Sequence, residues 1–200
     1  MTKPQNPPRR MGRTALLAAA IASVGVSPLV AALPAQAEKA VAPERNPPGD
    51  IPDTQVFITY HSAAGGYSLK VPEGWARREA GADVQFAAKL DAVAVNVEPT
   101  ATAPTVAWVK SAYVPAMIKA GRAVKVSAVS AVHLPGGNAV RIAYAVNSEP
   151  NPVTSKQVRL EANRYLFFKG GKRAALDLTA PYGSDNVDQW RLMSRSFRWR

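Results

Sequence analysis

The stretch VRLEANRYLFFKGGKRAALDLTA, residues 158–180, decides the fold. Two runs of strand-like composition flank Gly170-Gly171, and a glycine pair supplies the positive φ angles of a tight hairpin turn. Successive side chains of a strand point to opposite faces of its sheet, so Phe167 and Phe168 point apart. One of the two rings therefore lies outside the main core, either under a helix or available to a partner.

The chain from Val56 onward repeats this alternation of strand-like runs and turn signals. With the two runs of the central hairpin, the strand-like runs are 56–60, 67–71, 84–89, 93–98, 124–134, 140–147, 158–168 and 174–180. Gly65-Gly66 and the PGGN sequence at 135–138 are further hairpin turns. Hairpins join antiparallel neighbours, which predicts an antiparallel sheet.

Two segments change to the helical period. In the first, apolar residues recur at steps of three and four, at Val106, Val109, Tyr113 and Met117. Pro104 suits its first turn and Gly121 its C-terminal end, and Pro115 should kink or split it. The second helix follows Ser184 or Asp185 as its N-cap. Its residues expected to face the sheet are Val187, Trp190, Leu192 and Met193. The prediction is an α+β domain, an antiparallel sheet with helices packed on it.

Three packing motifs follow one another along this domain. They are YxLxVPxGW at 67–75, YLFF with a glycine turn and LxLxA at 165–180, and a helix with Trp190 that ends in SF at 196–197. Their order and spacing resemble PsbP-like proteins, the superfamily of the extrinsic photosystem II protein and the Mog Ran-binding protein. The resemblance covers residues 56–199 and implies an αβα sandwich around an antiparallel sheet.

The same resemblance implies an accessory protein compatible with export more than it implies an enzyme. The Ala- and Arg-rich chain is more similar to an actinobacterial secreted homologue than to a thylakoid subunit. Photosystem binding, Ran binding and the metal or partner residues of the family have no matching motif in this sequence. None of them is carried over.

Residues 1–37 have the order of a secretory signal peptide. A basic stretch without acidic residues precedes an Ala-rich apolar run, residues 14–33. Ala35 and Ala37 then match the A-x-A cleavage pattern, which predicts a cut before Glu38. The sequence therefore predicts a secreted protein that works outside the cytoplasm.

Two alternatives for this segment stay open. The apolar run is long enough to span a bilayer, so an uncut segment would tether the protein to a membrane, although Pro28 makes it a poor anchor. Arg9-Arg10 raises a twin-arginine route, but the residues after the pair fit that signal badly. After the signal, residues 38–55 are predicted to be a Pro-rich flexible linker, and residues 56–200 a single domain.

Composition restricts the chemistry and the partners. The chain has no cysteine, which excludes a lipoprotein anchor, disulfides and thiolate metal sites. Its 25 basic and 14 acidic residues give a net charge of +11, and removal of the four basic residues of the signal leaves 21 basic residues and +7. A basic exported protein favours anionic partners, such as acidic lipid headgroups or wall polymers.

Basic residues near the last hairpin and the last helix are a candidate anion-binding face. They are Arg159, Lys169, Lys172, Arg173, Arg191 and Arg195. Such residues also suit solvated strand ends and the C-terminal turn of a helix, so the sequence leaves open whether they share one face. Nucleic acid is not an expected partner, because an aromatic and basic binding signature is missing. Membrane contact is expected only through an uncut signal or through this basic face.

A hydrolase would have to start from His61-Ser62 or from His133, together with a carboxylate that orients the histidine. Asp83 and Asp177 are the candidate carboxylates. The sequence has no G-x-S-x-G, H-E-x-x-H, P-loop or dinucleotide-binding motif, and both histidines adjoin turns. No catalytic, cofactor or metal residue is therefore predicted.

Three functions from different classes remain. The favoured hypothesis is a non-catalytic exported accessory or binding protein, which docks on an extracytoplasmic membrane complex or holds a small ligand. The second is an envelope protein that binds polyanions through the basic face. The third is a hydrolase with an unrecognised site.

Overall fold

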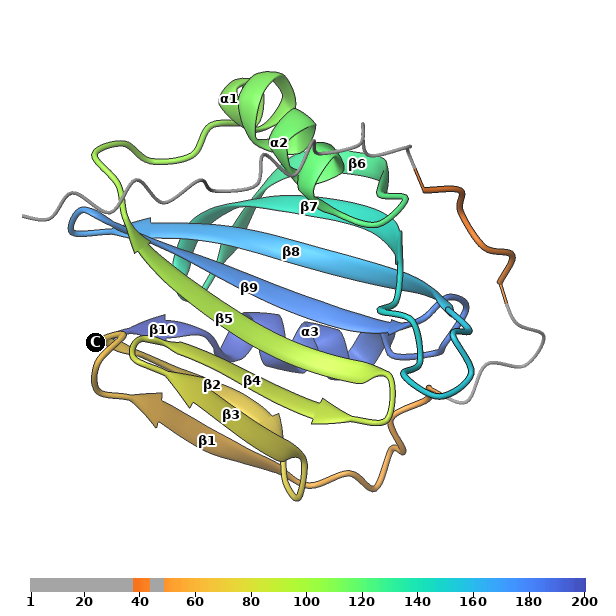
Figure 1. The fold of residues 1–200 in the computed structure, drawn as a ribbon. Coiled ribbons are helices and arrows are strands. Elements are labelled where there is room, and N and C mark those ends of the chain that lie inside the picture. The colour runs from red at the N-terminus through yellow and green to blue at the C-terminus, as the bar shows by residue number, and fades with distance from the viewer. Residues whose placement is uncertain (1–37, 44–48) are drawn as a thin grey trace, which may run out of the picture. The chain divides into compact units, whose positions relative to one another are not determined.

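The computed structural model describes residues 38–43 and 49–200. The predicted signal segment, residues 1–37, lies outside the described residues. Within the described ranges the strands form two antiparallel sheets (Figure 1). The small sheet has the order β1-β2-β10, and the large sheet has the order β3-β4-β5-β9-β8-β7-β6. The strands are β1 Phe57–Ser62, β2 Tyr67–Pro72, β3 Ala76–Ala80, β4 Asp83–Ala88, β5 Asp91–Pro99, β6 Lys125–Leu134, β7 Gly137–Asn147, β8 Arg159–Lys169, β9 Lys172–Pro181 and β10 Arg198–Trp199.

The central hairpin forms as the sequence predicts. Strands β8 and β9 pair antiparallel, with Phe167 opposite Ala174. Gly170 and Gly171 have φ angles of 56° and 74°, both in the left-handed region that a tight two-residue hairpin turn requires. Phe167 is fully buried, whereas Phe168 on the other face of the sheet is only partly buried. The face of the hairpin that carries Phe167 is therefore more completely covered by other elements than the face that carries Phe168.

A helical segment covers one face of the large sheet (Figure 1). The segment consists of α1 Val106–Trp108, the π-helical turn η1 Val109–Tyr113 and α2 Val114–Ala120. The last helix, α3 Val187–Ser196, lies on the opposite face of the sheet. The hydroxyl of Thr105 caps the segment. Pro115, predicted to kink or split this helix, does not interrupt the helical backbone; a π-helical turn, η1, ends two residues before this proline, which has no N–H to donate. Val109 is fully buried in this layer and packs in one cluster with Val140 and Ile142 of β7.

Helix α3 and the small sheet together cover the other face. Met193 is fully buried, and Phe197 stacks on the ring of Phe167 with 4.3 Å between ring centroids. The prediction that Val187 and Leu192 face the sheet is wrong, because they are 62% and 38% exposed. Leu192 is turned by about 100° from its neighbour Met193, and so it leaves the buried stripe of the helix.

These layers confirm the predicted α+β fold, with helices on both faces of an antiparallel sheet. Two features were not predicted. The small sheet lies in the same layer as α3. The edge strand of the large sheet, β3, has five residues that are all exposed. An edge strand with both faces in water needs no apolar alternation, so its sequence gives no strand signal.

The start of α3 differs from the prediction. Its N-cap is Asn186, and the side chain of Asn186 makes no capping bond. Instead, Asn186 Oδ1 accepts from the Ile51 backbone N at 2.7 Å, and Asn186 Nδ2 donates to the Gly49 backbone O at 2.7 Å. Asn186 and Ile51 are both buried. This part of the predicted flexible linker 38–55 is therefore fixed to the domain, which corrects the prediction.

Candidate functional site

A groove lies between α3 and the face of β6, β7 and β8 that α3 covers. Two adjoining hollows, of about 520 Å³ and 310 Å³, form it. The lining residues that both hollows share are Arg141, Glu161, Asn163 and Trp190. Because the two hollows meet at these side chains, they form one surface, called here the α3 groove.

Strand alternation explains why polar side chains reach the groove. Val140 and Ile142 of β7 are buried on the side of α1 and α2, so Arg141 between them points to the opposite side. Arg141 pairs across the strands with Tyr165, and its Nε donates to Oδ1 of Asn163 at 2.8 Å. This diagonal cross-strand bond fixes the guanidinium over the sheet.

Two arginines of the groove have hydrogen-bonding capacity that the described residues do not use. A guanidinium has five N–H donors, and the bond to Asn163 is the one that Arg141 makes within the described part of the chain. Arg195 is exposed on α3, and its guanidinium bonds to no side chain or backbone group in residues 38–43 or 49–200. Both side chains can therefore bind an anion without first breaking an ion pair.

The charge of the groove is positive. Its cationic lining residues are Lys125, Arg141, Arg191 and Arg195. Among the described lining residues Glu161 is the acid; burial raises the pKa of its carboxyl, and the Gly183 backbone N–H donates to it at 3.2 Å. Arg191 pairs with Asp188 at 2.9 Å, but both side chains are largely exposed, so the pair is weak.

Part of the groove lining is apolar. Trp190 and Val132 are partly buried and pack against the core, and Tyr165 is 8% exposed. Val187, which does not face the core as predicted, lies at the wall of the groove. The groove therefore joins apolar lining residues to basic side chains, an arrangement that suits a ligand with both an apolar part and a negative charge.

The structure does not bring the six residues of the predicted anion-binding face together. Arg191 and Arg195 line the α3 groove. Lys169 and Lys172 are exposed at the tip of the β8–β9 hairpin, where they pair directly across the turn. Arg159 lies at the other end of β8 from Lys169, about 33 Å away at the rise of a strand.

Two of these six residues, both arginines, are occupied by structural contacts. Arg159 is 5% exposed, and its Nη1 donates to the backbone O of Ala123 at 2.8 Å. Arg173 forms an ion pair with Glu98, and its guanidinium lies 4.9 Å from the ring centroid of Trp108. Basic residue type alone does not reveal this difference, because a long cationic side chain can be buried by a partner.

The residues considered for hydrolysis do not form a catalytic arrangement. Nδ1 of His133 lies 2.7 Å from Oδ1 of Asn138, and His61 is exposed on β1. Asp83 accepts from a backbone amide of β5, and Asp177 is paired with an arginine of β8. Within the described residues, no group of three or more potential metal ligands gathers.

A second cavity, of about 360 Å³, lies where residues 49–52 meet the turn between β4 and β5. Asp91 at this cavity is 7% exposed; its burial and the charge of Asp50 raise the pKa of its carboxyl to about 7. Lys89 lowers that pKa in part, and Asn186 Nδ2 lies 3.5 Å from the carboxyl. The cavity thus holds a titratable acid beside the segment that Asn186 fixes.

The sequence does not single out Arg141 or Asn163. A signal exists for Arg141, since a charged residue interrupts the apolar run 139–146 and must point away from its buried neighbours. The sequence does not show which elements pack on each face of the sheet, so it does not show what surrounds the Arg141 side chain.

The fold is that of PsbP-like proteins. The cyanobacterial PsbP protein of Synechocystis sp. PCC 6803, CyanoP, matches with a TM-score of 0.50 and 16% identity, covering 76% of this chain and 98% of CyanoP. The Ran-binding protein Mog1p of Saccharomyces cerevisiae gives a TM-score of 0.46 at 11% identity, over 73% of this chain and 96% of Mog1p.

LpqN of Mycobacterium tuberculosis, which is involved in cell envelope biogenesis, gives a TM-score of 0.41 at 16% identity, over 73% of this chain and 91% of LpqN. No family model and no curated protein matches the sequence. The resemblance inferred from the packing motifs is thus confirmed for the fold, and the actinobacterial character stays a prediction. None of the helices in the described residues is long and apolar enough to cross a membrane.

Proposed function

We propose that the chain is an exported, non-catalytic binding protein whose α3 groove holds a small amphiphilic anion. Such a ligand has an apolar body and one carboxylate or phosphate group. The observation that carries the proposal is the incompletely paired guanidinium of Arg141, which lines the same groove as the apolar ring of Trp190. The planar fork of an arginine suits carboxylates and phosphates, and the apolar lining suits a hydrocarbon chain.

Export and the absence of catalysis rest on separate observations. The basic, apolar and A-x-A order of residues 1–37 supports work outside the cytoplasm. The separation of the histidines from the candidate carboxylates supports binding without chemistry. An accessory role at an envelope protein or membrane complex is compatible with this function, because a loaded groove can present its ligand there.

Tryptophan fluorescence titration with three C12 amphiphiles tests the proposal. Dodecanoate should bind, whereas uncharged dodecanol and the cation dodecyltrimethylammonium should bind at least about tenfold more weakly, because they do not use the arginines. Equal affinity for all three would show an unspecific apolar surface and contradict the proposal.

A matched pair of double variants locates the site. The change Arg191→Gln with Arg195→Gln removes two charges from the groove and should weaken dodecanoate binding about tenfold. The change Lys169→Gln with Lys172→Gln removes two charges from the hairpin tip and should leave the affinity unchanged. If both pairs weaken binding equally, net charge and not the groove determines affinity.

One observation keeps the polyanion hypothesis as a second candidate. Lys169 and Lys172 face each other across one turn, and like charges in that position are unfavourable without a counter-ion. Binding to phosphatidylglycerol vesicles that weakens with salt, and that the hairpin variant abolishes, would favour this function. Binding that ignores salt and the hairpin variant would exclude it.

A further inference from the structure

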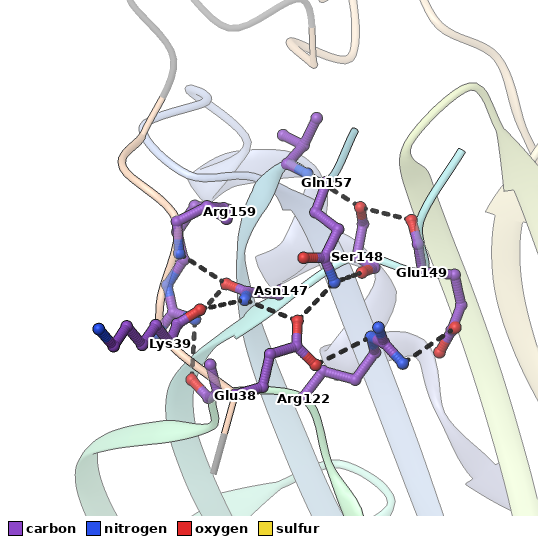
Figure 2. A network of polar contacts seen from close by, with 11 residues as sticks. Glu38, Lys39, Arg122, Asn147, Ser148, Glu149, Gln157 and Arg159 are labelled. Carbon is purple, nitrogen blue, oxygen red and sulfur yellow. Dashed lines mark hydrogen bonds and ion pairs between the residues drawn. The ribbon is translucent and has the colours of Figure 1, made fainter. Parts of the chain in front are cut away.

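Residues 38–43, called here the N-terminal segment, lie against the end of the large sheet where β7 ends and β8 begins (Figure 2). Asn147, the last residue of β7, is 2% exposed and binds three positions of this segment. Its Nδ2 donates to the Lys39 backbone O at 2.8 Å and to Oε1 of Glu38 at 3.0 Å. Its Oδ1 accepts from the Val41 backbone N at 3.2 Å.

With the segment in place, the amide of Asn147 makes all of its hydrogen bonds. An asparagine side chain has two donor hydrogens and an oxygen with two lone pairs. The segment takes both donor positions and one acceptor position, and Arg159 Nη1 donates to the second at 2.9 Å. Removal of the segment would break three of these four bonds and leave only water to replace them, so the segment and this end of the sheet are complementary.

The carboxylate of Glu38 is the most specifically held group of the segment. Gln157 Nε2 and Asn147 Nδ2 both donate to Oε1, and Nε of Arg122 lies 3.3 Å from Oε2 (Figure 2). These hydrogen bonds and then the charge of Arg122 lower the pKa of the Glu38 carboxyl. Glu149 holds Arg122 from its other side at 3.6 Å. Side chains from three separate parts of the chain thus converge on one carboxylate.

Glu38 is also the residue that follows the cleavage site predicted from the sequence. We propose that this end of the sheet is a binding site for the protein's own processed N-terminus, with Glu38 as the recognised side chain. The cut before Glu38 then leaves an N-terminus that is docked and protected from further trimming. The statement about processing rests on the proposed export, whereas the docking does not.

Hydrogen exchange at the Val41 amide of the full chain tests the docking. The Val41 amide should exchange at least about tenfold more slowly than in a free peptide of the same sequence. Glu38→Ala should remove most of this protection. Lys39→Ala is the matched control, because Lys39 is held through its backbone O, and it should leave the protection unchanged. Exchange of Val41 at the free-peptide rate, or equal effects of the two variants, would overturn the docking.

Trimming of the exported chain tests the consequence for processing. With a nonspecific aminopeptidase, the mass of the processed chain should stay at a start of Glu38, whereas Glu38→Ala should lose residues toward Pro43. Equal trimming of both chains would overturn the protection. A protected Val41 in a chain that is never cut before Glu38 would refute the processing and retain the docking, so the two failures are distinguishable.

Discussion

The arginines on the two faces of the large sheet differ in how completely their guanidinium groups are paired. On the face of α1 and α2, Arg164 binds both oxygens of Asp177, at 2.7 and 2.9 Å, and donates to the hydroxyl of Tyr113 at 3.0 Å. On the face of α3, Arg141 makes one bond, to Asn163, among the described residues. Arg164 pairs across the strands with the neighbour of Arg141, so the difference follows from the cover of each face. A fully paired arginine stabilises the fold, whereas a partly paired one remains available to a ligand.

The largest expected effect comes from breaking the paired face. Asp177→Ala leaves Arg164 without its counter-ion under the helical segment and should lower the free energy of unfolding by about 3 kcal/mol. The measurement is urea denaturation. Asp188→Ala is the control, since its pair with Arg191 is exposed and should matter by less than about 0.5 kcal/mol. Equal losses would remove the distinction between the paired face and the groove face.

Asp91 is a buried carboxyl without an ion-pair partner among the described residues, and it should make the stability of the fold depend on pH. Its folded pKa of about 7 lies above the ordinary value of 3.8, so the folded state binds the proton more tightly than the unfolded state. Stability should therefore fall as the pH rises from 4 to 7, and Asp91→Asn should abolish this fall. At pH 8 the variant should gain about 2 kcal/mol. A pH profile that Asp91→Asn does not change would contradict this assignment.

Arg141 sharpens the comparison because it should separate stability from binding. Arg141→Met keeps the stem of the side chain and should change the free energy of unfolding by less than about 1 kcal/mol. The same variant should weaken dodecanoate binding about tenfold, since it removes the fork. Arg164→Met is the counterpart on the other face and should lose stability without direct loss of binding. A loss of stability in Arg141→Met together with a loss of dodecanoate binding in Arg164→Met would contradict this assignment of the two faces.

The smallest effect concerns the N-terminal segment at low pH. Hydrogen bonds from Asn147 and Gln157, and then Arg122, lower the pKa of Glu38 from its ordinary 4.5, so docking is complete above that value and is lost as the pH falls through the folded pKa. Lys39, Glu149 and Arg159 are the other charged groups labelled in Figure 2. Glu38→Gln should remove this pH step in the protection of Val41. A step that persists in the variant would assign it to another group.

Much of the fold was predictable because local signals agreed with it. The glycine turn at 170–171 acts on the backbone itself, so its effect does not depend on distant residues. The strand β3 and the role of Asn186 were not predictable, since an exposed edge needs no pattern and Asn186 binds a segment 135 residues away.

The candidate site was less predictable than the fold. Arg159 and Lys169 lie on one strand and read alike in the sequence, yet one is buried against Asn147 and the other is exposed. The sequence reveals the charge of a side chain, but tertiary packing decides which charges are paired. The Pro-rich composition of residues 38–55 predicts a flexible linker for the same reason, because the sequence does not show that the side chains of Asn147 and Asn186 bind parts of it.

The indole N–H signals of the four tryptophans in a heteronuclear NMR titration with dodecanoate test the central claim most directly. Trp190 lines the α3 groove, and Trp108 lies on the opposite face beside Arg173. A saturable shift of the Trp190 signal with a stationary Trp108 signal is the predicted result. A shift of Trp108 with a stationary Trp190 would place the ligand on the wrong face of the sheet and contradict the claim.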